Sequence, residues 1–283
     1  MNRLRKMILS SLISLIGYIF RERTLALAKF LLPLLPYGKA IAVATILIRK
    51  YPTNDATIKF YDSARPRWKR AFVFRVNPAC PLSKLFALTG LYQPEMTEEL
   101  LKESYQGVFV DIGANFGYFS VLWLSKLRGD TLAIEPIRQN YELLTTNIRQ
   151  FGPRAKTLMQ CLGDRRGEVT MRYDPNHPML SRLSDDSTQD QKVEMETLRD
   201  VLEKEGLSRI DVLKCDAEGY DVKILRSAHE IFEERRVRVL FFEPETWDRG
   251  RDPELEAFNQ LLSANGYQSV PNKGDLCYSL RHL

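Results

Sequence analysis

Short apolar runs alternate along residues 108–243 with longer segments whose apolar residues recur every three or four positions. The short runs have the length of buried strands, and the longer segments have the periodicity of helices that bury one face. Strands that alternate with helices favour a mainly parallel sheet covered on both faces. The predicted strands are Val108–Asp111, Thr131–Pro136, Ala155–Leu162, Ile210–Asp216 and Val237–Glu243.

Helices, a long loop and a terminal hairpin complete the predicted domain. Helices are expected over Arg138–Phe151 and Tyr220–Glu234, and a further short strand over Glu168–Tyr173. The polar segment Asp174–Lys192 shows no periodicity, and a loop of that length in a compact domain is usually functional or disordered. The end of the chain, GYQSV and GDLCYSL on either side of Pro271-Asn272-Lys273, predicts a hairpin.

Residues 1–50 are apolar and basic, unlike the rest of the chain. The apolar run Met7–Phe20 has 14 residues, fewer than the roughly 20 that a membrane-spanning helix needs. Three interpretations are open: a helix in the membrane interface, a helix packed on the domain or on a partner subunit, and a signal or anchor. We expect residues 51–106 to form a lead-in hairpin and helix, and residues 107–283 to form the main domain.

The stretch VDIGANFGYFS is expected to bind an anionic ligand group. Asp111 ends the first strand, and Gly113 and Gly117 bound a turn from which a helix begins near Phe116. Because glycine lacks a Cβ, a ligand can approach the backbone, and the N-terminus of the helix presents unpaired N–H groups to it. Asn115 lies in the same turn, where it orients the loop or contacts the ligand.

The turn lacks the G-x-G-x-x-G pattern of dinucleotide sites, because Asp111 stands where the first glycine would be. A ligand with a pyrophosphate is therefore disfavoured. The next strand ends in Glu135, whose carboxylate can accept hydrogen bonds from both hydroxyls of a ribose. S-adenosylmethionine (SAM), a nucleoside with a carboxylate-bearing tail and no pyrophosphate, fits both features.

Several separated motifs resemble one family. VDIGANFGYFS, AIEP, ETLRDVL, IDVLKCDAEGYDVKILRSA and VLFFEPE occur in the order typical of the FkbM-type SAM-dependent methyltransferases, over roughly residues 93–245. The resemblance implies a Rossmann-like class I α/β fold, with a mainly parallel seven-stranded sheet and an antiparallel last strand, here preceded by a helical and β-hairpin extension. It also implies O-methylation, usually of a sugar or polyketide hydroxyl.

Ligands of open α/β sheets bind beyond the carboxyl ends of the strands, and acidic residues follow the predicted strands of this chain at those ends. The carboxylates expected to meet at this edge are Asp111, Glu135, Asp164, Asp216, Glu218 and Glu243. The cofactor is assigned to Asp111, Gly113, Asn115, Gly117, Glu135 and Asp164. The assignment of Asp164 depends on a third strand that ends beside the adenine; capping of a turn is the alternative role for this residue.

Asp216, Glu218 and Glu243 are the candidates for binding or deprotonating an acceptor hydroxyl, and His177 in the polar loop is a further one. Each has a plainer alternative. The segment Asp216-Ala217-Glu218-Gly219 can cap a helix and make its first turn acidic. Asp216 and Glu243 can bind Mg²⁺, although no third ligand is evident. His177 can be an ordinary surface residue.

Charge and cysteine content narrow the partners and the compartment. The formal net charge is +5, and residues 1–50 hold nine Lys and Arg against Glu22, so they carry +8 and the remainder carries 5 − 8 = −3. An acidic body disfavours nucleic-acid binding, whereas a basic leader suits peripheral contact with a membrane. The four cysteines lie far apart with no C-x-x-C, which favours buried thiols in a reducing compartment over a zinc site.

These observations predict that the methyl acceptor is a small molecule or a glycan, in the class of glycans, glycolipids and secondary metabolites. They also predict a cytoplasmic location at the inner face of the membrane. Two other functions are open from the sequence. One is a nicotinamide-dependent oxidoreductase on the same kind of sheet. The other is a non-catalytic binding module that is tethered to a membrane. Testing whether SAM or NAD(P)H raises the melting temperature distinguishes the first from a methyltransferase.

Overall fold

The structure, a computed structural model, describes residues 57–58, 74–75, 92–93, 96–97, 100, 105–126, 129–172, 182–183, 190–243, 252–270 and 276–280. The chain divides into two compact units, Met1–Pro94 and Glu95–Leu283. In the first unit, β1 (Thr57–Ile58) pairs antiparallel with β2 (Phe74–Arg75), as a lead-in hairpin requires. The leader of residues 1–50 lies outside the described residues. Within the described ranges, no helix has the length and apolar character needed to cross a bilayer.

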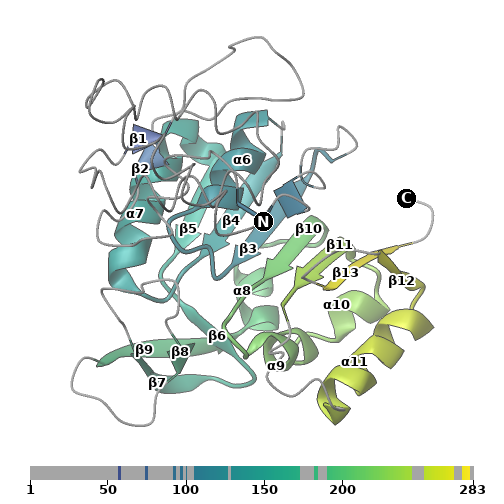
Figure 1. The fold of residues 1–283 in the computed structure, drawn as a ribbon. Helices are drawn as coiled ribbons and strands as arrows, with labels where there is room; N and C mark the ends of the chain where they lie inside the picture. The colour runs from purple at the N-terminus through teal and green to yellow at the C-terminus, as the bar shows by residue number, and fades with distance from the viewer. Residues whose placement is uncertain are drawn as a thin grey trace, which may run out of the picture. The chain divides into compact units, whose positions relative to one another are not determined.

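The second unit is built on a seven-stranded sheet with the strand order β12-β13-β11-β10-β3-β4-β5 (Figure 1). Strand β13 runs antiparallel to both β11 and β12, and the other neighbouring strands are parallel. The predicted mainly parallel sheet with an antiparallel last strand is therefore confirmed. The strands are β3 (Val108–Ile112), β4 (Asp130–Ile134), β5 (Ala155–Leu158), β10 (Ile210–Cys215), β11 (Val237–Phe242), β12 (Tyr267–Val270) and β13 (Leu276–Leu280).

Helices cover both faces of this sheet. Successive side chains of a strand point to opposite faces, so the partners of two neighbouring residues of β3 show which helices cover each face. The ring of Phe109 lies 5.3 Å from that of Trp123 in α6. The next residue, Val110, belongs instead to a buried cluster that includes Leu198 of α8 and Leu262 of α11. The helices are α6 (Tyr118–Lys126), α7 (Arg138–Ile148), α8 (Leu198–Lys204), α9 (Asp221–Arg226), α10 (Glu230–Glu233) and α11 (Pro253–Ala264).

A second, four-stranded sheet of order β6-β9-β7-β8 corrects two predictions. The expected strand Ala155–Leu162 divides into β5, which ends at Leu158, and β6 (Cys161–Gly163), which pairs with β9 (Asp190–Thr197). The expected loop Asp174–Lys192 is also partly strand. It contains β8 (Arg182–Leu183), which pairs with β7 (Gly167–Arg172), and the first residues of β9.

Two predicted helices are not continuous α-helices. The helix from Arg138 stops at Ile148 and continues as the 3-10 helix η2 (Arg149–Arg154), in which Gly152 has a positive φ of 64°. The segment Tyr220–Glu234 is broken into α9 and α10 by a turn at Ser227–His229.

The small sheet lies against the turn that follows β4. The Gln191 side chain of β9 donates to the Pro136 carbonyl at 3.2 Å. Ile137, on the same turn, packs in a buried cluster with Cys161 of β6 and Met195 of β9. Figure 1 shows β6, β7, β8 and β9 grouped below β3, β4 and β5. The small sheet therefore packs next to the end of β4.

Candidate functional site

Five of the six predicted carboxylates meet at one edge of the main sheet. In the paired registers, Asp111 lies beside Lys214 on one side and Ala133 on the other, and Cys215 lies beside Phe242. The carboxyl ends of β3, β4, β10 and β11 are therefore adjacent. Asp111 lies within β3, and the four carboxylates that follow β4, β10 and β11 are Glu135, Asp216, Glu218 and Glu243. Their predicted convergence is confirmed.

The sixth carboxylate, Asp164, follows a different strand from the one expected. Its expected position required a third main-sheet strand that extends to residue 162, whereas β5 ends at Leu158. Asp164 instead follows β6 of the small sheet, where it is exposed. Its assignment to the cofactor stays a prediction.

The glycine turn after β3 is tightly constrained by the chain itself. Gly113 has a φ of +68°, and a Cβ there would overlap the backbone carbonyl oxygen of Asp216. Gly117 has a φ of +89°, and a Cβ there would lie 2.7 Å from Cδ1 of Leu144. The sequence analysis explained these glycines by the room that they leave for a ligand, whereas the structure gives a different reason for them. The missing Cβ atoms allow the turn to pack against the loop after β10 and against α7.

Hydrogen bonds fix the turn between its two glycines. The Ala114 amide donates to the Ile134 carbonyl at 3.0 Å, which ties the turn to the end of β4. Asn115 adopts a positive φ of 52°, and its side-chain oxygen accepts from the Phe116 amide at 2.9 Å. Asn147 of α7 donates to the Phe116 carbonyl at 2.8 Å. Asn115 therefore orients the turn, which is one of its two predicted roles.

Glu135 connects this turn to the end of β4. Its buried carboxylate accepts from the Asn115 amide at 2.8 Å through Oε2, and from the Ile137 amide at 3.0 Å through Oε1. The Asn140 side chain donates to Oε1 at 3.4 Å. Burial raises the pKa of Glu135 to about 7, and the hydrogen bonds from Ile137, Asn115 and Asn140 oppose that shift.

These bonds limit what Glu135 can offer a ligand. A carboxylate has about four acceptor positions, and the three donors described leave a position on Oε2. As arranged here, Glu135 can accept from one ribose hydroxyl, and accepting from both, as the sequence predicted, requires Asn140 to move.

A buried lysine joins the first strand to the loop after β10. Nζ of Lys214 lies 3.5 Å from Oδ1 of Asp111 and 3.2 Å from Oδ2 of Asp216, and it donates to the carbonyls of Ile112 and Gly113 at 3.3 Å. The other oxygen of Asp111 accepts from Ser120 at 2.7 Å. Burial raises the pKa of Asp111, and the charge of Lys214 opposes the shift. Asp111 is thus held by protein groups.

The remaining carboxylates influence one another across the ends of β10 and β11. Glu218 keeps exposed surface. Desolvation of its carboxyl and the charges of Asp216, Glu243 and Asp221 nevertheless raise the pKa of Glu218 to about 7. Desolvation and Asp216 raise the pKa of Glu243 as well. Glu218 also has a positive φ of 48°, which is strained for a residue with a side chain.

Asp221 belongs to this group, although the sequence analysis did not single it out. Its side chain is fully buried, and it accepts from the amides of Ala217 and Glu243 at 3.1 and 3.4 Å. Desolvation and Asp216 raise the pKa of Asp221 to about 7. The only sequence signal was its position five residues after Asp216 at the start of a helix, which is also where ordinary acidic first-turn residues occur.

His177 lies outside the described residues. Cys161 and Cys215 are free and buried, as predicted. Among the residues that the structure describes, no three His, Cys, Asp or Glu are arranged to hold a metal ion.

Comparison with known proteins identifies a family. Residues 111–269 match the family described as the methyltransferase FkbM domain. The methyltransferase sdnD of Sordaria araneosa is 29% identical over 201 residues, which cover 59% of this chain and 75% of that protein. The family match covers more than half of the chain and agrees with the resemblance that the separated motifs carry.

Solved structures of other methyltransferases are similar to this chain at low sequence identity. An O-methyltransferase from Bacillus cereus in complex with SAH has 11% identity and a TM-score of 0.40, covering 68% of this chain and 83% of that chain. Precorrin-6y C5,15-methyltransferase from Geobacter metallireducens GS-15 has 13% identity and a TM-score of 0.39, covering 66% and 86%. TM-scores below 0.5 are too low for a comparison of sites, so the family match identifies the chain.

Proposed function

This chain belongs to the FkbM methyltransferase family and is a SAM-dependent methyltransferase, and from that premise we propose that it methylates a hydroxyl of a glycan, glycolipid or secondary metabolite. The observation that carries the proposal is that the glycine turn and the acidic residues lie at the same edge of the sheet. There the turn held by Glu135 lies beside carboxylates that can receive a hydroxyl proton. Family membership sets aside the nicotinamide-dependent and non-catalytic alternatives.

The residues at this edge fit SAM. Glu135 retains an acceptor position for a ribose hydroxyl beside the turn of Gly113–Gly117. Asp111 and Glu135 are both buried near a single described buried cation, Lys214, so a cationic ligand would relieve their unfavourable burial. SAM, when bound, supplies a methyl group on a positively charged sulfur that leaves as a neutral thioether.

Glu218 is the proposed general base. A pKa of about 7 gives a useful fraction of carboxylate at neutral pH and leaves it basic enough to accept a proton. Its carboxylate would take the hydroxyl proton as the acceptor oxygen forms its bond to the methyl carbon. Asp216 and Glu243, whose charges act on Glu218, would hold the acceptor hydroxyl in line with the methyl group. His177 stays a further candidate from the polar loop.

The assignment of Glu218 predicts a loss of turnover without a loss of cofactor affinity. Glu218→Gln keeps the size of the side chain and removes the base, so kcat should fall by roughly 10²- to 10⁴-fold, with the Kd for SAM unchanged. Glu256→Gln is the matched control, because Glu256 is exposed on α11. Timed transfer of labelled methyl groups measures kcat, and calorimetric titration measures the Kd for SAM. A Glu218→Gln enzyme with wild-type kcat would show that another group accepts the proton.

The acceptor class is tested with labelled SAM and fractionated cell extract. Label in glycan, glycolipid or small-molecule fractions, stable to mild base as an ether is, supports the proposed O-methylation. Label in RNA or DNA would contradict both the acceptor class and the proposed absence of a nucleic-acid partner.

We also propose that residues 1–50 make a peripheral contact with the cytoplasmic face of a membrane. Their net charge of +8 and the short apolar run Met7–Phe20 suit an interfacial helix on anionic lipid. The full chain should sediment with vesicles that contain phosphatidylserine and release at high salt. Replacing Arg3, Arg5 and Lys6 by Gln should weaken that binding, and equal binding to neutral vesicles would contradict the proposal.

A further inference from the structure

We infer that Asp221 is a positioning residue for methyl transfer: its buried carboxylate holds the loop after β10 and the end of β11 together, and so sets the spacing between Glu218 and Glu243. The inference rests on the proposed function, because Glu218 and Glu243 are the acceptor-side groups of that proposal. No motif or comparison assigns this role.

The contacts of Asp221 are divided between the loop after β10 and the residue after β11. Oδ2 accepts from the Ala217 amide at 3.1 Å, immediately before Glu218. Oδ1 accepts from the Glu243 amide at 3.4 Å, directly after β11. One carboxylate therefore fixes the backbone at both candidate acceptor-side residues, which are 25 positions apart in the sequence.

Capping of a helix does not account for this arrangement. Asp221 is the first residue of α9, and the N-cap position is occupied by Tyr220. A capping side chain serves the N–H groups of its own helix, whereas Oδ1 of Asp221 serves an amide of a different strand. A fully buried carboxylate is also an expensive way to start a helix, because its charge loses hydration.

The charge of Asp221 acts on Glu218, one of the two groups that it positions. The titratable and charged groups that influence it or respond to it are Asp216, Lys214, Cys215 and Glu218. The negative charge of Asp221 is one of the charges that raise the pKa of Glu218. A neutral side chain at position 221 should therefore lower that pKa and move the acidic limb of the pH profile to lower pH.

Asp221→Asn tests the inference, since an amide has one acceptor oxygen and can serve only one of the two N–H groups. We expect kcat to fall by about 100-fold, the effect of misplacing a reacting group by about 1 Å. The Kd for SAM should stay within twofold, and the acidic limb of kcat should shift to lower pH. Asp221→Glu, which keeps both oxygens and the charge, should restore the position of that limb.

Asp252→Asn is the matched control, because Asp252 caps α11 through the Glu254 amide and should change neither kcat nor the pH profile. An Asp221→Asn enzyme with wild-type kcat and pH profile would overturn the inference. Loss of folding in Asp221→Asn, seen by circular dichroism, would also overturn it, because the residue would then be a structural one. If the wild-type enzyme methylates no hydroxyl acceptor, the proposed function fails instead, which separates the two outcomes.

Discussion

The backbone of Gly113 is the residue-level feature on which the cofactor turn depends. It places the turn against the Asp216 carbonyl, while Lys214 donates to the carbonyls of Ile112 and Gly113 from the other strand. The turn after β3 and the loop after β10 are thus built against each other. A substitution in one of these two segments should therefore shift the backbone of the other.

Gly113→Ala should be far more damaging than an alanine at an open glycine of similar conformation. Gly206, which follows α8, has a φ of +65° with no neighbouring atom within 4 Å of an added Cβ, so Gly206→Ala should cost about 1 to 2 kcal/mol of left-handed strain. Gly113→Ala adds a clash with backbone, which should lower the free energy of unfolding by about 3 kcal/mol more. Urea unfolding of both variants measures the difference; equal losses would show that the Asp216 carbonyl moves away freely.

The sequence was informative about single residues where chemistry and strand position coincide. Glu135 and Asp216 follow strands directly, so their meeting at one edge could be predicted from parallel topology. Asp221 could not be, because its second partner, the Glu243 amide, is contributed by a strand distant in sequence. The division of the carboxylate oxygens of Glu135 among three donors was equally hidden, since it depends on the path of the turn.

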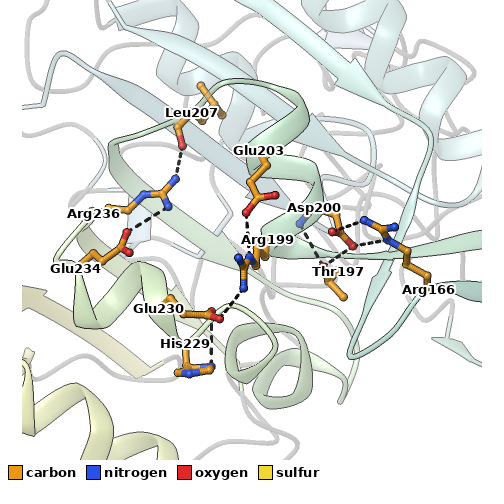
Figure 2. Close-up of polar contacts among 10 residues, drawn as sticks. All are labelled: Arg166, Thr197, Arg199, Asp200, Glu203, Leu207, His229, Glu230, Glu234 and Arg236. Atoms are coloured by element: carbon orange, nitrogen blue, oxygen red, sulfur yellow. Dashed lines mark hydrogen bonds and ion pairs between the residues drawn. The ribbon is translucent and has the colours of Figure 1, made fainter.

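Among the elements, α8 shows how the small sheet is joined to the main domain. Figure 2 shows Arg166, from the turn between β6 and β7, facing Asp200 in the first turn of α8. Its guanidinium makes two hydrogen bonds to the Asp200 carboxylate, at 2.8 and 2.6 Å. Arg199 on the same helix reaches Glu230 of α10 at 2.9 Å. α8 therefore links the small sheet to the helices that cover the main sheet.

Thr197→Ala should weaken this helix without affecting cofactor binding. The Thr197 hydroxyl accepts from the Asp200 amide at 3.2 Å as the N-cap of α8 and donates to the Asp200 carboxylate at 2.7 Å. Its loss should lower the free energy of unfolding by about 1 kcal/mol, measured by urea unfolding, whereas Thr197→Ser should retain most of it. A larger loss with Ser than with Ala would contradict the capping role.

The elements that the sequence misjudged share one cause. Ala155–Leu162 contains no glycine or proline, so its pattern predicts one strand. The break becomes visible only from Met159, which is 42% exposed, and from Gln160, whose side chain donates to the Glu194 carbonyl of β9. Likewise, the turn at Ser227–His229 keeps helical spacing of apolar residues on either side. Tertiary partners decided both breaks, and periodicity does not report them.

For the whole molecule, the buried carboxyl groups predict how stability depends on pH. The pKa values of Glu135 and Asp221 are both raised to about 7. Between their ordinary values and about 7, the folded state therefore holds more protons than the unfolded chain, and stability falls as pH rises. Each group contributes roughly 2.5 kcal/mol over this range, so without SAM the free energy of unfolding should be about 5 kcal/mol lower at pH 8 than at pH 5. Urea titrations at the two values test this, and a protein that is more stable at pH 8 would contradict it.

The central claim is that SAM binds at the end of β4, beside the turn that Glu135 holds. The most direct test is calorimetric titration of SAM into the wild-type protein and Glu135→Ala, with Glu142→Ala as the control because Glu142 is exposed on α7. Loss of a hydrogen bond to a charged group should weaken binding by roughly 10- to 100-fold in Glu135→Ala. The circular dichroism spectrum and the affinity of Glu142→Ala should be unchanged. A folded Glu135→Ala that binds SAM as tightly as the wild type would contradict the account.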